Sequence, residues 1–281
     1  MRAIAWGTAP ERERALERLR NEDEVITGIA AARLAVNFRD FDAASRTAQL
    51  LTESQRTADW RAAGHILLAQ LAAARGDMAL ADREIDAALP LERDWAMEMR
   101  GLLALHPLNH ADRARLELAR AEIASWNPGA ASPSLSFFFA THADVHAPLR
   151  VYLLALIDVA LGDAEGAERL RQDLVQMGRS AETRAVAVAL SHSVDAHARA
   201  ARGDLRGALA RLDDARLTAS LERVALSSFF SQALDRRLRA GIHEQLGETA
   251  DAARWYGSLM EGADIMFAAE AAQRRAELSR R

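Results

Sequence analysis

Residues 180–217, SAETRAVAVALSHSVDAHARAARGDLRGALARLDDARL, decide the fold of this chain. They consist of a predicted helix, a tight corner at Gly203 and Asp204, and a second predicted helix. Glycine is favoured at such a corner because it enters the left-handed region without steric cost. After the corner, apolar residues recur at spacings of three and four, the period of an apolar stripe on an α-helix. These residues are Leu205, Ala208, Leu209, Leu212 and Ala215. The stretch therefore predicts two antiparallel helices.

The same arrangement recurs along the chain. Ala196 lies seven residues before the corner glycine and Ala208 lies five after it. Small residues at these two places let the helices of a pair cross closely. The spacing is repeated in Ala69, Gly76 and Ala81, in Ala155, Gly162 and Ala167, and in Ala240, Gly247 and Ala252. Each of these glycines predicts another corner between two helices.

Two further predicted corners depart from this pattern. At Arg39 the flanking alanines, Ala32 and Ala44, keep their places but the glycine is missing. At Asn109 we expect asparagine to replace glycine, because it tolerates the left-handed region better than most residues. The six corners lie 33 to 53 residues apart, and a period of this size built from helix pairs indicates a solenoid.

We therefore expect an all-α chain that forms one domain over residues 1–281. No window shows the alternation of apolar and polar residues that is typical of strands. The expected architecture is an α-solenoid of about six antiparallel helix pairs, with a charged first helix at 10–20 and a C-terminal closing helix at 264–280. Half of the residues are hydrophobic, which is ample material for a core.

These units resemble the tetratricopeptide repeat (TPR) family, whose repeat of about 34 residues has small residues at matching places in both helices. The resemblance covers most of the chain. In addition, residues 132–170 and 227–259 resemble the helical-repeat tails that stand behind kinase or transcription-regulator domains in large bacterial signalling proteins. The resemblance implies that the first helices of successive units line a concave groove that holds a protein or peptide partner.

Six polar residues are predicted to face that groove when positions are counted back from each corner. They are Gln70, Tyr152, Ser193, His197, Arg237 and Glu244. We predict that they contact the partner of a non-catalytic scaffold or sensor module. The other interpretation of each residue is a solvated surface position.

Residues 127–148 form an irregular insertion with three prolines and the run Phe137, Phe138 and Phe139. Leaving these rings in water costs roughly 1.5 to 3 kcal/mol each, so they must pack against something. They either fold back to fill the interior of the solenoid or line a ligand pocket or partner surface. The second possibility gives an alternative function, a small-molecule or signalling-peptide sensor with this loop as its lid.

Composition excludes several other classes of protein. The 36 basic and 40 acidic residues are intermixed and give a net charge of −4, which argues against nucleic acid as the main ligand. The absence of cysteine excludes disulfides and thiolate catalysis. No apolar run reaches the length of a membrane span and the N-terminus lacks an apolar leader segment, so we expect a cytoplasmic protein with no membrane partner.

Metal binding and catalysis are not predicted. Two pairs of histidines have a spacing of four, namely His106 with His110 and His142 with His146. Zinc accepts imidazole ligands, but Pro107 interrupts helical geometry in the first pair and Asp144 is the only carboxylate near the second. No nucleophilic serine motif or phosphate-binding glycine loop is present. We predict no metal, no cofactor and no enzymatic activity; a metal-dependent enzyme is the alternative. The sequence does not predict the oligomeric state or the identity of the partner.

Overall fold

The structure is a computed structural model that describes residues 9–20, 28–29, 31–32, 35, 40–109, 112–128, 145–178, 181–217, 232–261 and 266–280. All regular secondary structure in these residues is helical, and no strand occurs among them, so the all-α prediction is confirmed. None of the helices in this part of the chain has the length and apolar character needed to cross a membrane.

The helices and their bounds are best given in chain order. They are α2 (Ala9–Arg20), α4 (Phe41–Leu51), α5 (Ala58–Ala74), α6 (Met78–Ala88), α7 (Arg93–Ala104), α8 (Arg113–Ser125), α10 (His146–Leu161), α11 (Ala164–Gln176), α12 (Ala181–Ala201), α13 (Leu205–Asp214), α15 (Ala233–Gln245), α16 (Thr249–Glu261) and α17 (Ala268–Leu278). The charged first helix is confirmed as α2. The closing helix is confirmed as α17, which begins at Ala268 where 264 was expected.

Four of the predicted corners join neighbouring helices as expected. The glycines between α5 and α6, α10 and α11, α12 and α13, and α15 and α16 all have positive φ: Gly76 (80°), Gly162 (81°), Gly203 (84°) and Gly247 (76°). The alanines predicted at the crossings, positions 69, 81, 155, 167, 196, 208, 240 and 252, are all at most 2% exposed. Small side chains therefore lie at the closest approach of each helix pair.

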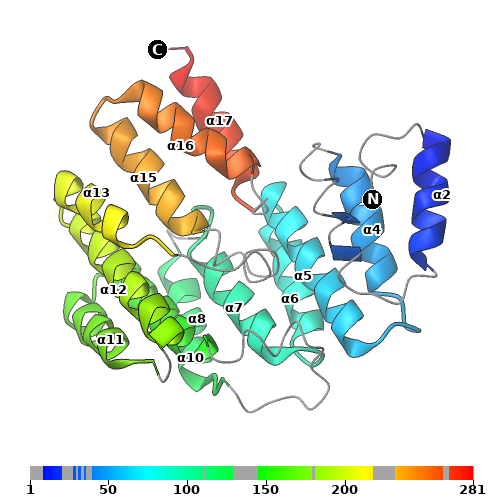
Figure 1. Ribbon diagram of the computed structural model, residues 1–281, viewed down its shortest axis with the longest axis horizontal. Coiled ribbons are helices and arrows are strands. Elements are labelled where there is room, and N and C mark those ends of the chain that lie inside the picture. The colour runs from blue at the N-terminus through cyan, green and yellow to red at the C-terminus, as the bar shows by residue number, and fades with distance from the viewer. Residues whose placement is uncertain are drawn as a thin grey trace.

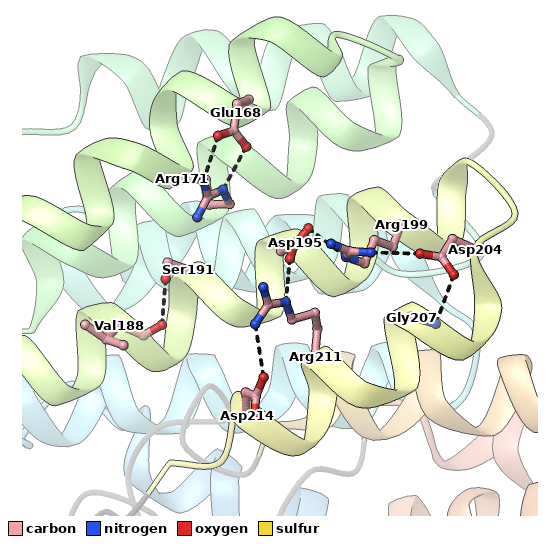
Figure 2. A network of polar contacts seen from close by, with 10 residues as sticks. All are labelled: Glu168, Arg171, Val188, Ser191, Asp195, Arg199, Asp204, Gly207, Arg211 and Asp214. Carbon is pink, nitrogen blue, oxygen red and sulfur yellow. Dashed lines mark hydrogen bonds and ion pairs between the residues drawn. The ribbon is translucent and has the colours of Figure 1, made fainter.

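An aspartate after the corner begins the second helix of most pairs. The side chain of Asp204 accepts a hydrogen bond of 3.0 Å from the backbone N–H of Gly207, and Asp77 and Asp163 do the same for the residue three positions on. Such N-caps satisfy a helical N–H that has no partner within the helix. In Figure 2, Arg199 joins this aspartate to Asp195 of α12, and Asp195 also binds Arg211 of α13. Charged contacts thus tie the two helices of this unit together outside its apolar stripe.

The corner at Asn109 differs from our prediction. Gln232 is the residue other than glycine that has positive φ in the described part of the chain, so Asn109 does not adopt the left-handed conformation. Instead, Asn109 is buried and its side-chain amide donates a hydrogen bond of 2.8 Å to the carbonyl of Leu103 at the end of α7. The asparagine is thus held by its side chain and does not substitute for a glycine. The predicted corner at Arg39 lies outside the described residues.

The C-terminal helices return to the middle of the molecule. Figure 1 shows the helices from α4 to α13 following one another along an arc, while α15, α16 and α17 turn back toward α5 and α7. Helix α17 contacts α5, and the ring of Phe267 stacks on the ring of His106 with 5.1 Å between centroids. The Nε2 of His106 donates to the carbonyl of Met266 at 2.9 Å. We call these contacts of His106 with Met266 and Phe267 the clasp; it closes the C-terminal part of the chain onto the end of α7.

Candidate functional site

A hollow of about 390 Å³ lies between the first helices of three successive pairs, α10, α12 and α15. The C-cap residue of α7, Leu105, completes it. Its other lining residues are Leu156, Val159, Ala160, His197, Ala200, Ala201, Leu234, Arg237, Leu238 and Gln245. We call it the apolar hollow, because most of these side chains are aliphatic.

A second hollow of about 470 Å³ adjoins the first. It shares Arg237, Leu238 and Gln245 with the apolar hollow. Its remaining lining residues come from α15, α16 and α17 and are Gly241, Glu244, Tyr256, Glu270 and Arg274. We call this one the charged hollow, and the two together the groove.

The ionic groups of the charged hollow face one another. The Nε and Nη2 atoms of Arg237 each lie 2.8 Å from an oxygen of Glu270, which makes a two-point ion pair between α15 and α17. The hydroxyl of Tyr256 donates to Glu244 at 3.2 Å, and Arg274 lies 4.0 Å from the same carboxylate. Burial, together with the negative charge of Glu244, raises the pKa of Tyr256 to about 12, so its hydroxyl stays protonated. Two arginines and two glutamates leave the hollow without net charge.

A buried layer of hydrogen bonds supports the groove from beneath. The hydroxyl of Ser193 donates to Asp235 at 2.5 Å and lies 3.0 Å from the hydroxyl of Tyr152. The Nε2 of His197 lies 3.2 Å from the same oxygen of Asp235. Burial raises the pKa of Tyr152 well above its usual value. This layer fixes α10, α12 and α15 relative to one another and orients the His197 ring at the wall of the apolar hollow.

The predicted contact residues fall into three groups. His197, Arg237 and Glu244 line the groove. Tyr152 and Ser193 belong to the buried layer beneath it, where they position helices and do not reach its surface. Gln70 is buried in α5 and lines neither hollow. The predicted contacts Phe137, Phe138 and Phe139, with most of the 127–148 insertion, lie outside the described residues.

Counting back from the corners missed the contribution of the closing helix. Glu270 and Arg274 belong to no repeat unit, and they reach the groove only because α17 returns along α15 and α16. Tyr256 was missed because it lies on the second helix of its pair. No local sequence signal places these three residues beside Arg237.

The described histidines and carboxylates offer one set with metal-like spacing. Suitable atoms of His243, Glu248 and Asp251 lie within 4.8 Å of one another. However, Glu248 already binds Arg206 at 2.5 Å and Asp251 binds Arg254 at 2.9 Å. The set also stands at the N-terminal end of α16, where the helix dipole is positive and disfavours a cation. We therefore assign these contacts to the stability of the corner.

A buried acidic cluster at the start of α7 also lies away from the groove. Burial and the neighbouring charge of Asp94 raise the pKa of Glu92 to about 7. The indole of Trp126 donates to Asp94 at 2.7 Å, and the Nδ1 of His146 lies 3.6 Å from Asp94. These groups join α7, α8 and α10, so their observed contacts are those of helix packing.

The described lining of the groove contains no serine, threonine or cysteine that could serve as a nucleophile. It offers aliphatic surface, internally paired charges and the polar groups of His197, Gln245 and Tyr256, which suit binding by contact and hydrogen bonding. The chain has no significant match among protein-family models, curated proteins or solved structures.

Proposed function

We propose that this chain is a TPR-like α-solenoid of about six helix pairs with a closing helix, and that it is a non-catalytic scaffold whose groove holds a peptide segment of a protein partner. One observation carries the proposal: the first helices of three successive pairs, α10, α12 and α15, line a continuous groove. Inner helices of stacked repeats form extended binding surfaces of this kind. The volumes of its hollows lie in the range of ligand sites.

The groove can be blocked at a position where a larger side chain disturbs little of the surrounding structure. Gly241 lies within α15 and lines the charged hollow, and a Cβ atom added there would meet Tyr256 Oη at 4.0 Å as its nearest neighbour. Alanine at this place should fit and strengthen the helix, since glycine in a helix interior costs about 1 kcal/mol. Phenylalanine should fit the backbone equally and fill the hollow.

The test is affinity capture from native lysate with three baits: the unaltered chain, Gly241→Ala and Gly241→Phe. Circular dichroism and thermal unfolding first confirm that both variants are folded. The proposal expects partners that are retained by the unaltered chain and by Gly241→Ala but lost by Gly241→Phe. Recovery of the same partners in the same amounts with all three baits would show that the groove does not hold them.

A small-molecule sensor is the second candidate function, and the enclosure of the apolar hollow by aliphatic side chains favours it. Its mark is a rise in the unfolding temperature of the purified chain with a small apolar compound, lost in Gly241→Phe or in Ala201→Trp, which fills the apolar hollow from an exposed position. A peptide scaffold shows no such rise without its partner.

A further inference from the structure

We infer that the segment held in the groove inserts an aliphatic side chain into the apolar hollow and carries no charged side chain where it crosses the charged hollow. This inference rests on the proposed function and adds the chemistry of the partner to it. It follows from the lining of the two hollows and from the pairing of their charges.

The apolar hollow selects for aliphatic surface. Eight of its eleven lining residues are leucine, valine or alanine, and none is aromatic. A leucine, isoleucine or valine side chain placed there gains about 1.5 to 3 kcal/mol from removal of its surface from water. A charged side chain would lose its hydration among these residues, and the nearest cation, Arg237, already holds a carboxylate.

The charged hollow selects against ionic partners because its own charges are matched. A carboxylate from a partner would have to displace Glu270 from Arg237, which leaves two carboxylates in one partly buried site. A cationic group would likewise displace an arginine from its glutamate. The Arg237 and Glu270 side chains are only 33% and 19% exposed, so an ion left without its partner here is costly.

The remaining polar groups of the groove suit the backbone of an extended peptide. The amide of Gln245 lines both hollows and can donate and accept hydrogen bonds, and His197 lines the apolar hollow. Peptide N–H and C=O groups need such partners when they leave water. An extended, uncharged stretch of another protein, with one aliphatic anchor, therefore complements the groove in shape, polarity and charge.

The experiment uses a random peptide library displayed on phage, selected on the full Gly241→Ala chain and depleted on Gly241→Phe. We expect enriched peptides to share an aliphatic position flanked by uncharged residues. Because no ion pair is formed with the protein, their affinity should change less than about twofold between about 0.1 M and about 1 M sodium chloride.

The outcomes separate this inference from the proposed function. Enrichment of acidic or basic peptides, with affinity that falls steeply with salt, overturns the inference but leaves the groove as a peptide site. If no peptide distinguishes Gly241→Ala from Gly241→Phe, both fall.

A second variant tests whether internal pairing is what excludes charge. Glu270→Gln removes the carboxylate from Arg237 and keeps the size of the side chain, so the selection should shift toward peptides with an acidic residue. The matched control is Glu277→Gln on the same helix, because Glu277 binds Arg274 and does not line the groove. The same uncharged peptides from Glu270→Gln and from Glu277→Gln would contradict the role given to the Arg237–Glu270 pair.

Discussion

The glycine corners and the corner at Asn109 perform the same turn by different means. At Gly162, Gly203 and Gly247, an added Cβ would meet nothing within 4 Å, so these corners stand clear of other parts of the molecule. At the end of α7, by contrast, His106 and Asn109 are buried, and the stacked ring of Phe267 comes from a segment 160 residues further along the chain.

The difference shows what a departure from the repeat pattern is for. A glycine corner is made by local backbone geometry and one aspartate cap, so it needs no distant partner. The Asn109 corner has lost the glycine but offers His106 and Leu105, one to the clasp and the other to the apolar hollow. The irregular unit is thus the one that receives the returning C-terminal helices.

The largest effect is expected from breaking the irregular corner's distant contact. Phe267→Ala removes a fully buried ring and should lower the free energy of unfolding by about 3 to 5 kcal/mol. Urea denaturation measures the loss, and hydrogen exchange should rise first in α17. Phe41→Ala, a half-buried ring at the other end of the array, should leave exchange in α17 unchanged. Equal exchange in α17 for both variants would mean that the clasp does not hold it.

Restoring the repeat's own glycine at the irregular corner should harm it. Asn109→Gly removes the amide that binds the carbonyl of Leu103 and adds backbone freedom to the unfolded chain, for a loss of about 2 kcal/mol. Thermal or urea unfolding provides the measurement. Asn109→Asp is the companion variant, since it keeps the shape but lacks the donor. A stabilised Asn109→Gly protein would show that the corner prefers left-handed geometry after all.

The regular corners should respond in the opposite sense, and alike. Gly203→Ala places a side chain at a φ of 84° without any clash, so only the conformational cost of about 1 to 2 kcal/mol remains. Gly162→Ala should cost the same, because its φ is 81° and its surroundings are equally open. Unequal losses at the two sites, measured under one set of conditions, would contradict the view that these corners are purely local.

The smallest effect concerns pH, and it separates the two kinds of corner. Burial lowers the pKa of His106, whose Nδ1 accepts from the N–H of Leu108 and whose other neighbouring charges are Glu270 and Arg237. Protonation therefore favours the unfolded chain, and the stability due to His106 is lost as pH falls below about 6.5. His106→Gln keeps a donor for Met266 and does not titrate.

Urea midpoints of the two proteins at pH 8 and pH 5 test this. The unaltered chain should lose more stability on acidification than His106→Gln, and Gly203→Ala should follow the unaltered chain. Parallel losses in the unaltered chain and in His106→Gln would exclude the histidine as the cause.

Much of the local structure followed from the sequence because its causes are local. A glycine between two apolar stripes, an aspartate after it and alanines at fixed distances were enough to place the turns at Gly76, Gly162, Gly203 and Gly247. The same reasoning erred at Asn109, where a side-chain hydrogen bond to Leu103 replaced a backbone preference. Propensity alone contains no information about that bond.

The groove could be predicted only in part for the same reason. His197, Arg237 and Glu244 follow from the inward faces of repeated helices, whereas Glu270 and Arg274 depend on the direction in which α17 returns. Tyr152 and Ser193 face inward as well, but the packing of three helices buries them. Depth within a stack of helices is set by the neighbours, which a count from each corner does not include.

The clasp also determines how the molecule should carry a mechanical load. Tension applied at the two chain ends passes from α17 through Phe267 to His106, and so bypasses the chain between them. The helices that line the groove, α10, α12 and α15, all lie within that bypassed stretch. A pull on the protein would thus leave the groove intact until the stacked rings part.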